Sequence, residues 1–218
     1  MDNLINELDI NKVKYLFPPT KNYNKLMISN EGVYSMTPYK CADVMTKIIY
    51  DLFDTKDLTI VDATSNVGGN TISFSKVFNK VISIEKNNKT FLMLKNNINV
   101  YELHNITVYN DDCINKIPNI KEDIDIIFID PPWGGKSYKK FKFLYLSLSD
   151  LNIVEVIKKL SEHTKAIALK IPFNFNFIHF FKNLDYMKFS LYKIHFKYYM
   201  LVLTKKFKVT NSKKNQIK

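Results

Sequence analysis

The chain has 218 residues, enough for one domain with a short appendage. Its formal charge of +11 predicts an anionic partner, nucleic acid or a nucleotide, although an AT-rich genome would also enrich lysine. Two cysteines and four scattered histidines exclude a disulfide framework and lack the spacing of metal ligands, so we expect no metal. Without an apolar run of about 18 residues or a signal peptide, we expect a soluble, intracellular protein with no membrane partner.

Two helices are expected ahead of the first strand. Residues 3–15 can form a short amphipathic helix that ends at Pro18-Pro19, and residues 20–36 read as irregular. Thr37-Pro38 is a helix start, with Thr37 as N-cap and Pro38 at the first helical position. That helix should run to about Phe53 and turn six side chains inward: Cys41, Val44, Met45, Ile48, Ile49 and Leu52.

From residue 58 on, predicted strands and helices alternate, which indicates a mostly parallel sheet with helices on both faces. The strands should cover 58–63, 80–85, 106–109, 124–129, 166–170, 186–192 and 196–204, and the helices 69–78, 88–101, 150–163 and 175–182. The last two strands should form an antiparallel hairpin at the sheet edge. The predicted fold class is α/β, a Rossmann-like seven-stranded sheet with this C-terminal edge hairpin. We divide the chain into a short helical N-terminal extension (1–36), the main domain (37–204) and a basic, flexible tail (205–218).

The most informative stretch follows the strand 124–129 and reads Asp130-Pro131-Pro132-Trp133-Gly134-Gly135. The prolines remove two backbone donors and fix φ, which makes the turn stiff. A stiff turn at a strand end holds a carboxylate and an aromatic ring where open α/β sheets bind ligands. The sequence therefore predicts a binding or catalytic site here, with Trp133 as a simple core anchor as the alternative.

A glycine-containing turn follows the first strand and opens the next helix, a place where the backbone can approach a bound nucleotide. Within it we assign Asp62, Thr64 and Gly68 to a cofactor site. Glu85 ends the second strand, where a carboxylate can accept hydrogen bonds from both hydroxyls of a ribose. After the third strand, Asp111 and Asp112 are both candidates to hold an adenine amino group.

The Asp-Pro-Pro-Trp stretch resembles methyltransferases that modify exocyclic amines of nucleobases. With Gly134-Gly135 it resembles more narrowly the trimethylguanosine synthase family, the RNA cap guanine-N2 methyltransferases. Two further segments are similar to that family: Tyr34-Ser35-Met36-Thr37-Pro38, and Asn96-Asn97 followed by Val100-Tyr101. The likeness covers about residues 12–204. It implies a seven-stranded class I methyltransferase with S-adenosyl-L-methionine as cofactor.

The resemblance also implies roles for single residues. It favours Asp112 over Asp111 for adenine and places Thr37 at the cofactor. Asn97 would touch the guanosine and Lys14 the cap.

For the chemistry, Asp130 and the Pro131 carbonyl would accept hydrogen bonds from the guanine N2 amine and stabilise the positive charge that develops during methyl transfer. Trp133 would stack on the base. Because 7-methylguanine is cationic, a tryptophan face binds it better than neutral guanine.

Three departures from the family pattern stand out. Thr64-Ser65-Asn66 replaces Phe-Cys-Gly in the first loop, and Asn tolerates positive φ better than most residues. Phe173 stands where the family has an arginine on the cap phosphates, and Lys170 or Lys136 could replace that charge. Asp130 stands where relatives often carry Ser or Asn, which leaves room for a different amine substrate.

These observations predict a monomeric enzyme that methylates N2 of a 7-methylguanosine RNA cap once or twice, in the nucleus, the cytoplasm or a viral replication site. Two alternatives stay open. The first is a nucleobase amino-methyltransferase acting on guanine N2 or adenine N6 in tRNA, rRNA or DNA. The second is a non-catalytic cap- or RNA-binding module.

Overall fold

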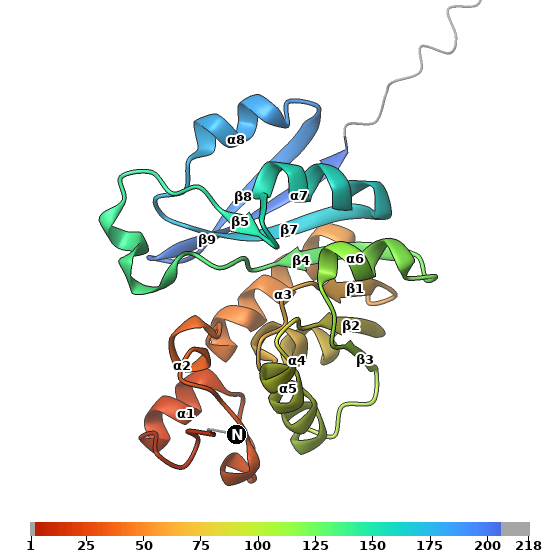
Figure 1. The fold of residues 1–218 in the computed structure, drawn as a ribbon. Helices are drawn as coiled ribbons and strands as arrows, with labels where there is room; N and C mark the ends of the chain where they lie inside the picture. Colours follow the sequence, from red (N-terminus) through yellow and green to blue (C-terminus); the bar gives the residue numbers. More distant parts are fainter. Residues whose placement is uncertain (1–2, 206–218) are drawn as a thin grey trace, which may run out of the picture.

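The computed structural model describes residues 3–205, apart from the side chain of Lys136, and contains one sheet of seven strands in the order β3-β2-β1-β4-β7-β9-β8 (Figure 1). The pairs among β3, β2, β1, β4 and β7 are parallel, and β9 runs antiparallel between β7 and β8. The strand order reverses between β1 and β4. The predicted fold class, a Rossmann-like sheet with an antiparallel C-terminal hairpin, is confirmed.

The strands of this sheet are β1 (Thr59–Asp62), β2 (Lys80–Ile84), β3 (Ile106–Tyr109), β4 (Ile124–Ile129), β7 (Thr164–Pro172), β8 (Met187–His195) and β9 (Tyr198–Lys205). A separate small hairpin consists of β5 (Ser147–Leu148) and β6 (Leu151–Asn152). The α-helices are α1 (Ile10–Leu16), α2 (Gly32–Ser35), α3 (Tyr39–Phe53), α4 (Gly69–Ser75), α5 (Asn88–Val100), α6 (Cys113–Lys116), α7 (Ile153–Leu160) and α8 (Phe177–Asn183). Short 3₁₀ turns are η1 (Tyr23–Lys25), η2 (Ile117–Asn119), η3 (Gly135–Lys140) and η4 (Ser161–His163).

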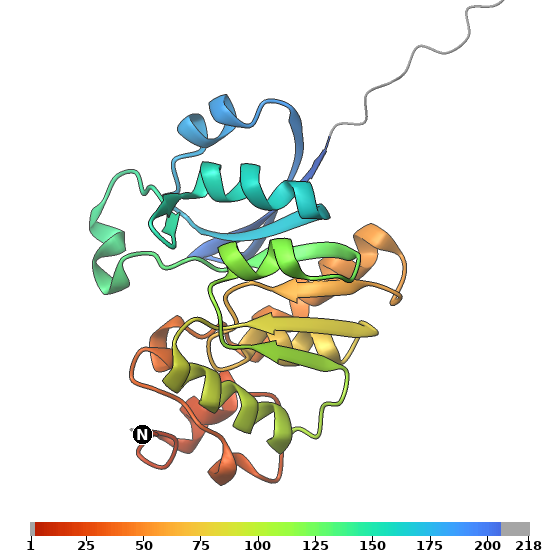
Figure 2. The same cartoon turned by 45° about the vertical axis from the view of Figure 1, so that its right-hand side comes forward.

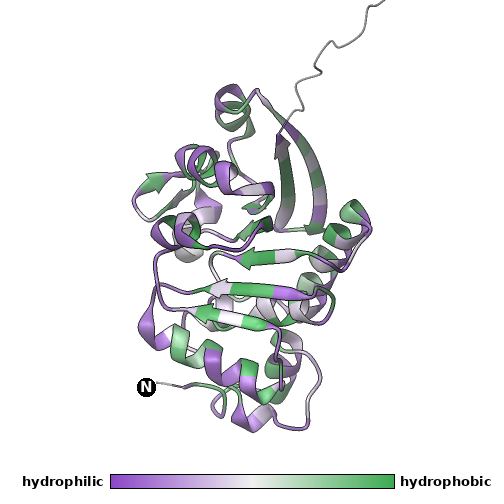
Figure 3. Ribbon diagram, turned by 90° about the vertical axis from the view of Figure 1, so that its right-hand side faces the viewer, coloured by the Kyte–Doolittle hydropathy of each residue, from purple (hydrophilic) through white to green (hydrophobic). Residues whose placement is uncertain are grey.

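The core lies on both faces of the sheet. One face packs against α3 and α4 through Met45, Ile49 and Phe74, and the other packs against α6, α7 and α8. Every residue of β4 is buried, as expected for a central strand covered on both sides. Figure 3 shows the apolar colouring concentrated along the strands, with polar residues on the outer helix faces. The carboxyl edge of the sheet is therefore presented by a rigid, buried frame.

The N-terminal segment packs beside α5 and forms a small core of its own around Phe17, Leu26 and Ile28 (Figure 2). Hydrogen bonds hold the two together, including one from the Tyr101 hydroxyl to the Pro18 carbonyl at 2.7 Å. No helix among residues 3–205 is long and apolar enough to cross a membrane.

Several predicted boundaries need correction. The helix expected at 3–15 begins only at Ile10, because the Asp9 side chain caps it by accepting from the Asn11 amide. The helix expected at 150–163 is α7, which begins after Asn152, and a capping box with Glu155 fixes that start. The β5–β6 hairpin was not predicted, and it takes up the residues just before α7. Residues 206–218, most of the predicted tail, lie outside the described part of the chain.

The start of α3 also differs. Pro38 and not Thr37 occupies the N-cap position, and no side chain caps the helix. Of the six residues predicted to face inward, Met45 and Ile49 are buried, whereas Val44 and Leu52 are exposed. The Thr37 side chain is buried and makes its hydrogen bonds elsewhere, at the carboxyl edge of the sheet.

Candidate active site

The candidate site lies at the carboxyl ends of β1 and β4, where the strand order of the sheet reverses. Open α/β sheets bind ligands at this topological switch point. The loop that contains η3 and the N-terminal segment with α1 and α2 flank this edge (Figure 1). The turn after β1 and the Asp130-Pro131-Pro132-Trp133 stretch after β4 are joined directly, because the Asp130 amide donates to the Thr64 hydroxyl at 2.7 Å.

The side chain of Asp62, which is completely buried, supports the turn after β1 through hydrogen bonds. Its carboxylate accepts from the Thr71 hydroxyl at 2.7 Å and from the Thr64 amide at 3.4 Å. Burial raises the pKa of Asp62 to about 7 even though these hydrogen bonds act in the opposite direction. Asp62 thus supports the turn from inside and has no exposed surface.

The glycines of this turn serve two different purposes. Gly68 has a φ of 105°, which disfavours other residues. At Gly69 an added Cβ would lie 2.9 Å from the Thr37 carbonyl oxygen, so the glycine lets the turn approach Thr37. Asn66, which replaces a family glycine, has a φ of 49°, as the tolerance of Asn for positive φ predicted.

Glu85, directly after β2, is fixed by backbone donors. One carboxylate oxygen accepts from the Asn66 amide at 2.9 Å and the other from the Asn87 amide at 2.8 Å. Burial raises the pKa of this carboxyl, and the two amides act in the opposite direction. The Lys86 amide also interacts with this carboxylate, and because a carboxylate offers about four acceptor sites, capacity for a further donor remains.

Asp112, after β3, caps α6 by accepting from the Ile114 amide at 2.9 Å. It also pairs with the Lys86 ammonium at 2.9 Å, and the lysine is largely exposed. Burial alone would raise the pKa of Asp112, but the hydrogen bonds, led by that from Lys86, outweigh it and lower the pKa. Its rival Asp111 is exposed.

Asp130, directly after β4, and Lys170, on β7, form a buried ion pair at the carboxyl edge of the sheet. The Lys170 Nζ lies 2.6 Å from a carboxylate oxygen of Asp130, and both side chains are at most 15 % exposed. Lys170 also donates to the Thr37 hydroxyl at 2.8 Å, and Thr37 accepts from the Asn70 amide group at 3.2 Å. Burial raises the pKa of Asp130, and the Lys170 charge opposes that rise.

This arrangement corrects the role predicted for Lys170. A lysine that is 4 % exposed and bonded to two partners has no reach to the phosphates of a cap. It neutralises the carboxylate of Asp130. The side chain of Lys136, the other residue considered for the phosphates, lies outside the described part.

Trp133 is half-buried among aromatic side chains. Its ring centroid lies 5.2 Å from that of Tyr138 and 6.0 Å from that of Tyr198. The Lys170 Nζ is 5.2 Å from the Trp133 centroid and 4.7 Å from the Tyr198 centroid. Trp133 therefore packs against the core, and its indole N–H is a buried donor without a partner.

Asn97 corrects a second prediction. It is fully buried on α5, and its amide group donates to the Met27 and Val67 carbonyls, each at 2.9 Å. Its oxygen accepts from the Met27 amide at 2.7 Å. With these bonds made, Asn97 clamps the N-terminal segment and the turn after β1 to α5, and it has no free group for a guanosine. Lys14, by contrast, is exposed on α1.

Two residues near the site were missed by sequence reasoning. Asn70 follows the glycine pair, so its position in the turn was a usable signal; its Oδ1 is buried without a donor. Tyr198, at the start of β9, contacts Trp133 only because the fold brings the two rings together. No local sequence pattern predicts this contact. Residues 3–205 contain no group of three or more His, Cys, Asp or Glu side chains that could hold a metal.

The fold and this edge define the class: a class I methyltransferase. The protein SMU.1697c from Streptococcus mutans, solved in complex with SAH, superposes with a TM-score of 0.52 at 16 % identity, covering 73 % of this chain and 96 % of that chain. This likeness concerns the fold.

The particular family is the RNA cap guanine-N2 methyltransferase family, to which the chain belongs, because the family model matches residues 58–216. The trimethylguanosine synthase of Schizosaccharomyces pombe is 35 % identical over 142 residues, 60 % of this chain and 57 % of that protein. Protein L320 of Acanthamoeba polyphaga mimivirus is 32 % identical over 227 residues, 91 % of this chain and 88 % of that one. The protein is thus an S-adenosylmethionine-dependent methyltransferase.

The residues at the cofactor side fit S-adenosylmethionine. Glu85 has acceptor capacity left for ribose hydroxyls, since its backbone donors use only part of it. The buried Asn70 Oδ1 lacks a donor, and an ammonium group would supply one. When bound, this cofactor provides an electrophilic methyl group on a positively charged sulfur.

Proposed function

We propose that this protein methylates the exocyclic N2 amine of 7-methylguanosine at the 5′ end of capped RNA. The observation that carries the proposal is the placement of Asp130. Asp130 directly follows β4, and its backbone amide donates to the Thr64 hydroxyl in the turn after β1. Its carboxylate pairs with Lys170, whose Nζ lies 5.2 Å from the Trp133 ring centroid. Membership of the cap guanine-N2 methyltransferase family supports the same substrate.

The guanine N2 lone pair is delocalised into the ring, so the amine is a weak nucleophile until it becomes pyramidal. A hydrogen bond from N2 to Asp130 favours that geometry and stabilises the charge that develops on nitrogen. Lys170, which also donates to Thr37, holds one oxygen of the carboxylate, and this orients the carboxylate before the reaction. The Pro131 carbonyl is a second acceptor in our proposal, and much of the rate comes from alignment of amine and methyl group.

Around this centre we propose the remaining roles. Glu85 accepts from the ribose hydroxyls of the cofactor, Asp112 from its adenine amino group, and Thr37 with Asn70 supports its amino-acid end. Asp62, Thr64 and Gly68 shape the turn that the cofactor contacts. On the substrate side Trp133 stacks on the base, and the exposed Lys14 contacts the cap.

A cationic base is compatible with Lys170 nearby. The lysine lies within cation–π distance of Trp133, but Asp130 balances its charge at 2.6 Å. The pair as a whole therefore does not repel 7-methylguanine, while the indole face still attracts it.

Methyl transfer to 7-methyl-GTP, GTP, capped RNA and uncapped adenine-containing RNA tests the proposal, with the product base identified in each case. We expect methylation of N2 in the two 7-methylated substrates and far slower turnover of GTP. Trp133→Phe should keep part of the activity because a phenyl ring still stacks, and Trp133→Ala should lose nearly all of it. Equal turnover of GTP and 7-methyl-GTP would contradict the cap substrate and favour guanine N2 in tRNA or rRNA.

A further inference from the structure

A row of aromatic rings passes Trp133 and ends in exposed phenylalanines on both sides. The ring centroids are separated by 4.2 Å for Phe196–His195, 5.2 Å for His195–Tyr198, 6.0 Å for Tyr198–Trp133, 5.2 Å for Trp133–Tyr138 and 6.3 Å for Tyr138–Phe173. The outermost residues are well exposed, Phe196 at 70 % and Phe173 at 46 %. The row thus connects the candidate base site to the surface in two directions.

The loop that follows Trp133 adds two more exposed phenylalanines, Phe141 at 56 % and Phe143 at 52 %. Asn174 fastens this loop, because its amide group donates to the Tyr138 carbonyl at 2.9 Å and to the Phe141 carbonyl at 2.8 Å. The next residue back, Phe173, donates its amide to the Lys197 carbonyl at 3.0 Å. We call the four exposed phenylalanines Phe141, Phe143, Phe173 and Phe196 the phenylalanine surface, since these bonds tie their segments together.

Positive charge is interleaved with these rings. The sequence from Trp133 to Ser149 contains four lysines and no acidic residue, and no acidic residue occurs after Asp185. The Lys142 Nζ lies 5.6 Å from the Phe143 centroid, and the Lys197 Nζ lies 5.1 Å from the Phe196 centroid. Lys139 and Lys140 precede Phe141 directly.

Exposed phenylalanines among lysines match one kind of ligand well. In single-stranded nucleic acid the bases offer faces for stacking and the phosphates offer charge to ammonium groups. Paired RNA hides its base faces inside the helix. A protein partner would use the rings but would need a strongly acidic surface for the lysines.

We propose that the phenylalanine surface binds the unpaired nucleotides that follow the cap, by stacking bases on its rings and pairing phosphates with the adjacent lysines. The direction of the RNA rests on the proposed function, because only a cap at Trp133 places the following nucleotides here.

The experiment measures affinity by fluorescence anisotropy for a capped RNA with a ten-nucleotide unpaired leader, the same RNA without a cap, and 7-methyl-GTP. The variant Phe141→Ala/Phe143→Ala/Phe196→Ala removes three rings and keeps Phe173, whose ring contacts Tyr138. Tyr186→Ala, exposed at 43 % and next to the amino end of β8, is the matched control. We expect the triple variant to bind both leader RNAs about tenfold or more weakly, the scale of one lost stack, and to turn over 7-methyl-GTP like the parent protein.

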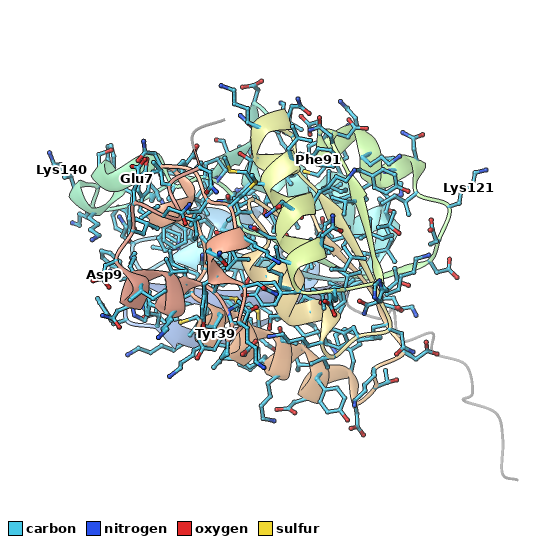
Figure 4. The ribbon with its side chains drawn as sticks, turned by 90° about the horizontal axis from the view of Figure 1, so that it is seen from below. Glu7, Asp9, Tyr39, Phe91, Lys121 and Lys140 are labelled. Atoms are coloured by element: carbon cyan, nitrogen blue, oxygen red, sulfur yellow. The ribbon has the colours of Figure 1, made fainter. Side chains whose placement is uncertain are left out.

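A second pair of variants tests the lysines, and both variants change the net charge of the protein by the same amount. Lys139→Glu/Lys140→Glu lies on the proposed surface, and Lys56→Glu/Lys121→Glu lies ahead of β1 and β4, at the other edge of the sheet. Figure 4 shows Lys140 and Lys121 at opposite ends of the molecule. The first variant should flatten the dependence of log affinity on log salt by roughly 1.4, at about 0.7 per lost phosphate contact, and the second should change it little.

An abasic leader shows whether stacking is the cause. Removing the bases should weaken binding to the parent protein and leave binding to the triple alanine variant nearly unchanged. Equal affinity of the parent and the triple variant for the leader RNAs overturns the proposal and leaves a protein partner for these rings. Leader binding that depends on the rings, in a protein that does not methylate 7-methyl-GTP, would overturn the proposed function and retain the RNA surface.

Discussion

On the cofactor side of the site, two backbone amides hold the Glu85 carboxylate, whereas on the base side the Lys170 side chain holds Asp130 across 40 residues of sequence. The first arrangement does not depend on which side chains the turn carries, so Thr64-Ser65-Asn66 can replace the family residues there. The second depends on one particular partner. From this difference we expect Asp130 and Lys170 to tolerate replacement only together, whereas the turn beside Glu85 should tolerate single changes.

The largest effect is expected from Asp130→Ala. In the proposed mechanism its hydrogen bond to the amine strengthens as charge develops, so kcat should fall about 10²–10³-fold with little change in KM. Steady-state kinetics with 7-methyl-GTP measure this, and Asp123→Ala, an exposed carboxylate ahead of β4, is the control. A loss confined to KM would make Asp130 a binding group and contradict the mechanism.

Lys170→Met breaks the pairing itself. It leaves a carboxylate buried without its cation, and we expect roughly 3 kcal/mol lower free energy of unfolding and a kcat reduced about tenfold or more. The pKa of Asp130 should rise further without Lys170, so the acidic limb of the kcat profile should move to higher pH. Lys165→Met is the control: it breaks the ion pair between Lys165, whose side chain is 71 % exposed, and Asp125. It should lower the free energy of unfolding by less than about 1 kcal/mol.

The double variant Asp130→Asn/Lys170→Met sharpens this result. It removes both charges of the pair. Stability should recover most of the loss seen in Lys170→Met, and the acidic limb assigned to Asp130 should disappear from the pH profile. A double variant as unstable as the single one would show that the lysine acts independently of Asp130.

On the cofactor side, Glu85→Ala should weaken S-adenosylmethionine binding by about 1.5–3 kcal/mol, the scale of lost charge-assisted hydrogen bonds. Isothermal titration calorimetry measures the affinity, and circular dichroism should show an intact fold. Glu122→Ala, which removes an exposed ion-pair partner of Lys80, is the control. Cofactor affinity equal in the Glu85 variant and the parent would remove this residue from the site.

The smallest effect concerns Asp62. Because its folded pKa of about 7 lies above that of the unfolded chain, the folded state binds this proton more tightly. The resulting stability is present at low pH and is lost as pH rises to about 7. Urea unfolding between pH 5.5 and 7.5 should therefore show the parent losing roughly 1–2 kcal/mol more than Asp62→Asn. Parallel pH profiles of the two proteins would place the ionisation elsewhere.

The fold was largely predictable because its signals are local. Ile106–Tyr109 and Ile124–Ile129 were predicted to the residue, since short apolar runs bounded by polar turns mark buried strands. Helix ends were less predictable because a capping side chain can start a helix at a different residue from the one that the apolar pattern indicates. Asn152 with Glu155 was a readable capping box, but Asp9 as a cap shortens a helix whose apolar pattern extends further back.

The sequence by itself determined the order of strands and helices, and it placed Glu85, Asp112 and Asp130 at strand ends, because parallel strands align their carboxyl ends at one edge. Only the tertiary structure decided what Asn97 and Lys170 do. An asparagine on a helix and a lysine in a strand look alike whether they face solvent or a partner. Asn97 proved to be a clamp and Lys170 the counter-ion of Asp130, because their partners come from distant segments that folding brings within hydrogen-bond distance.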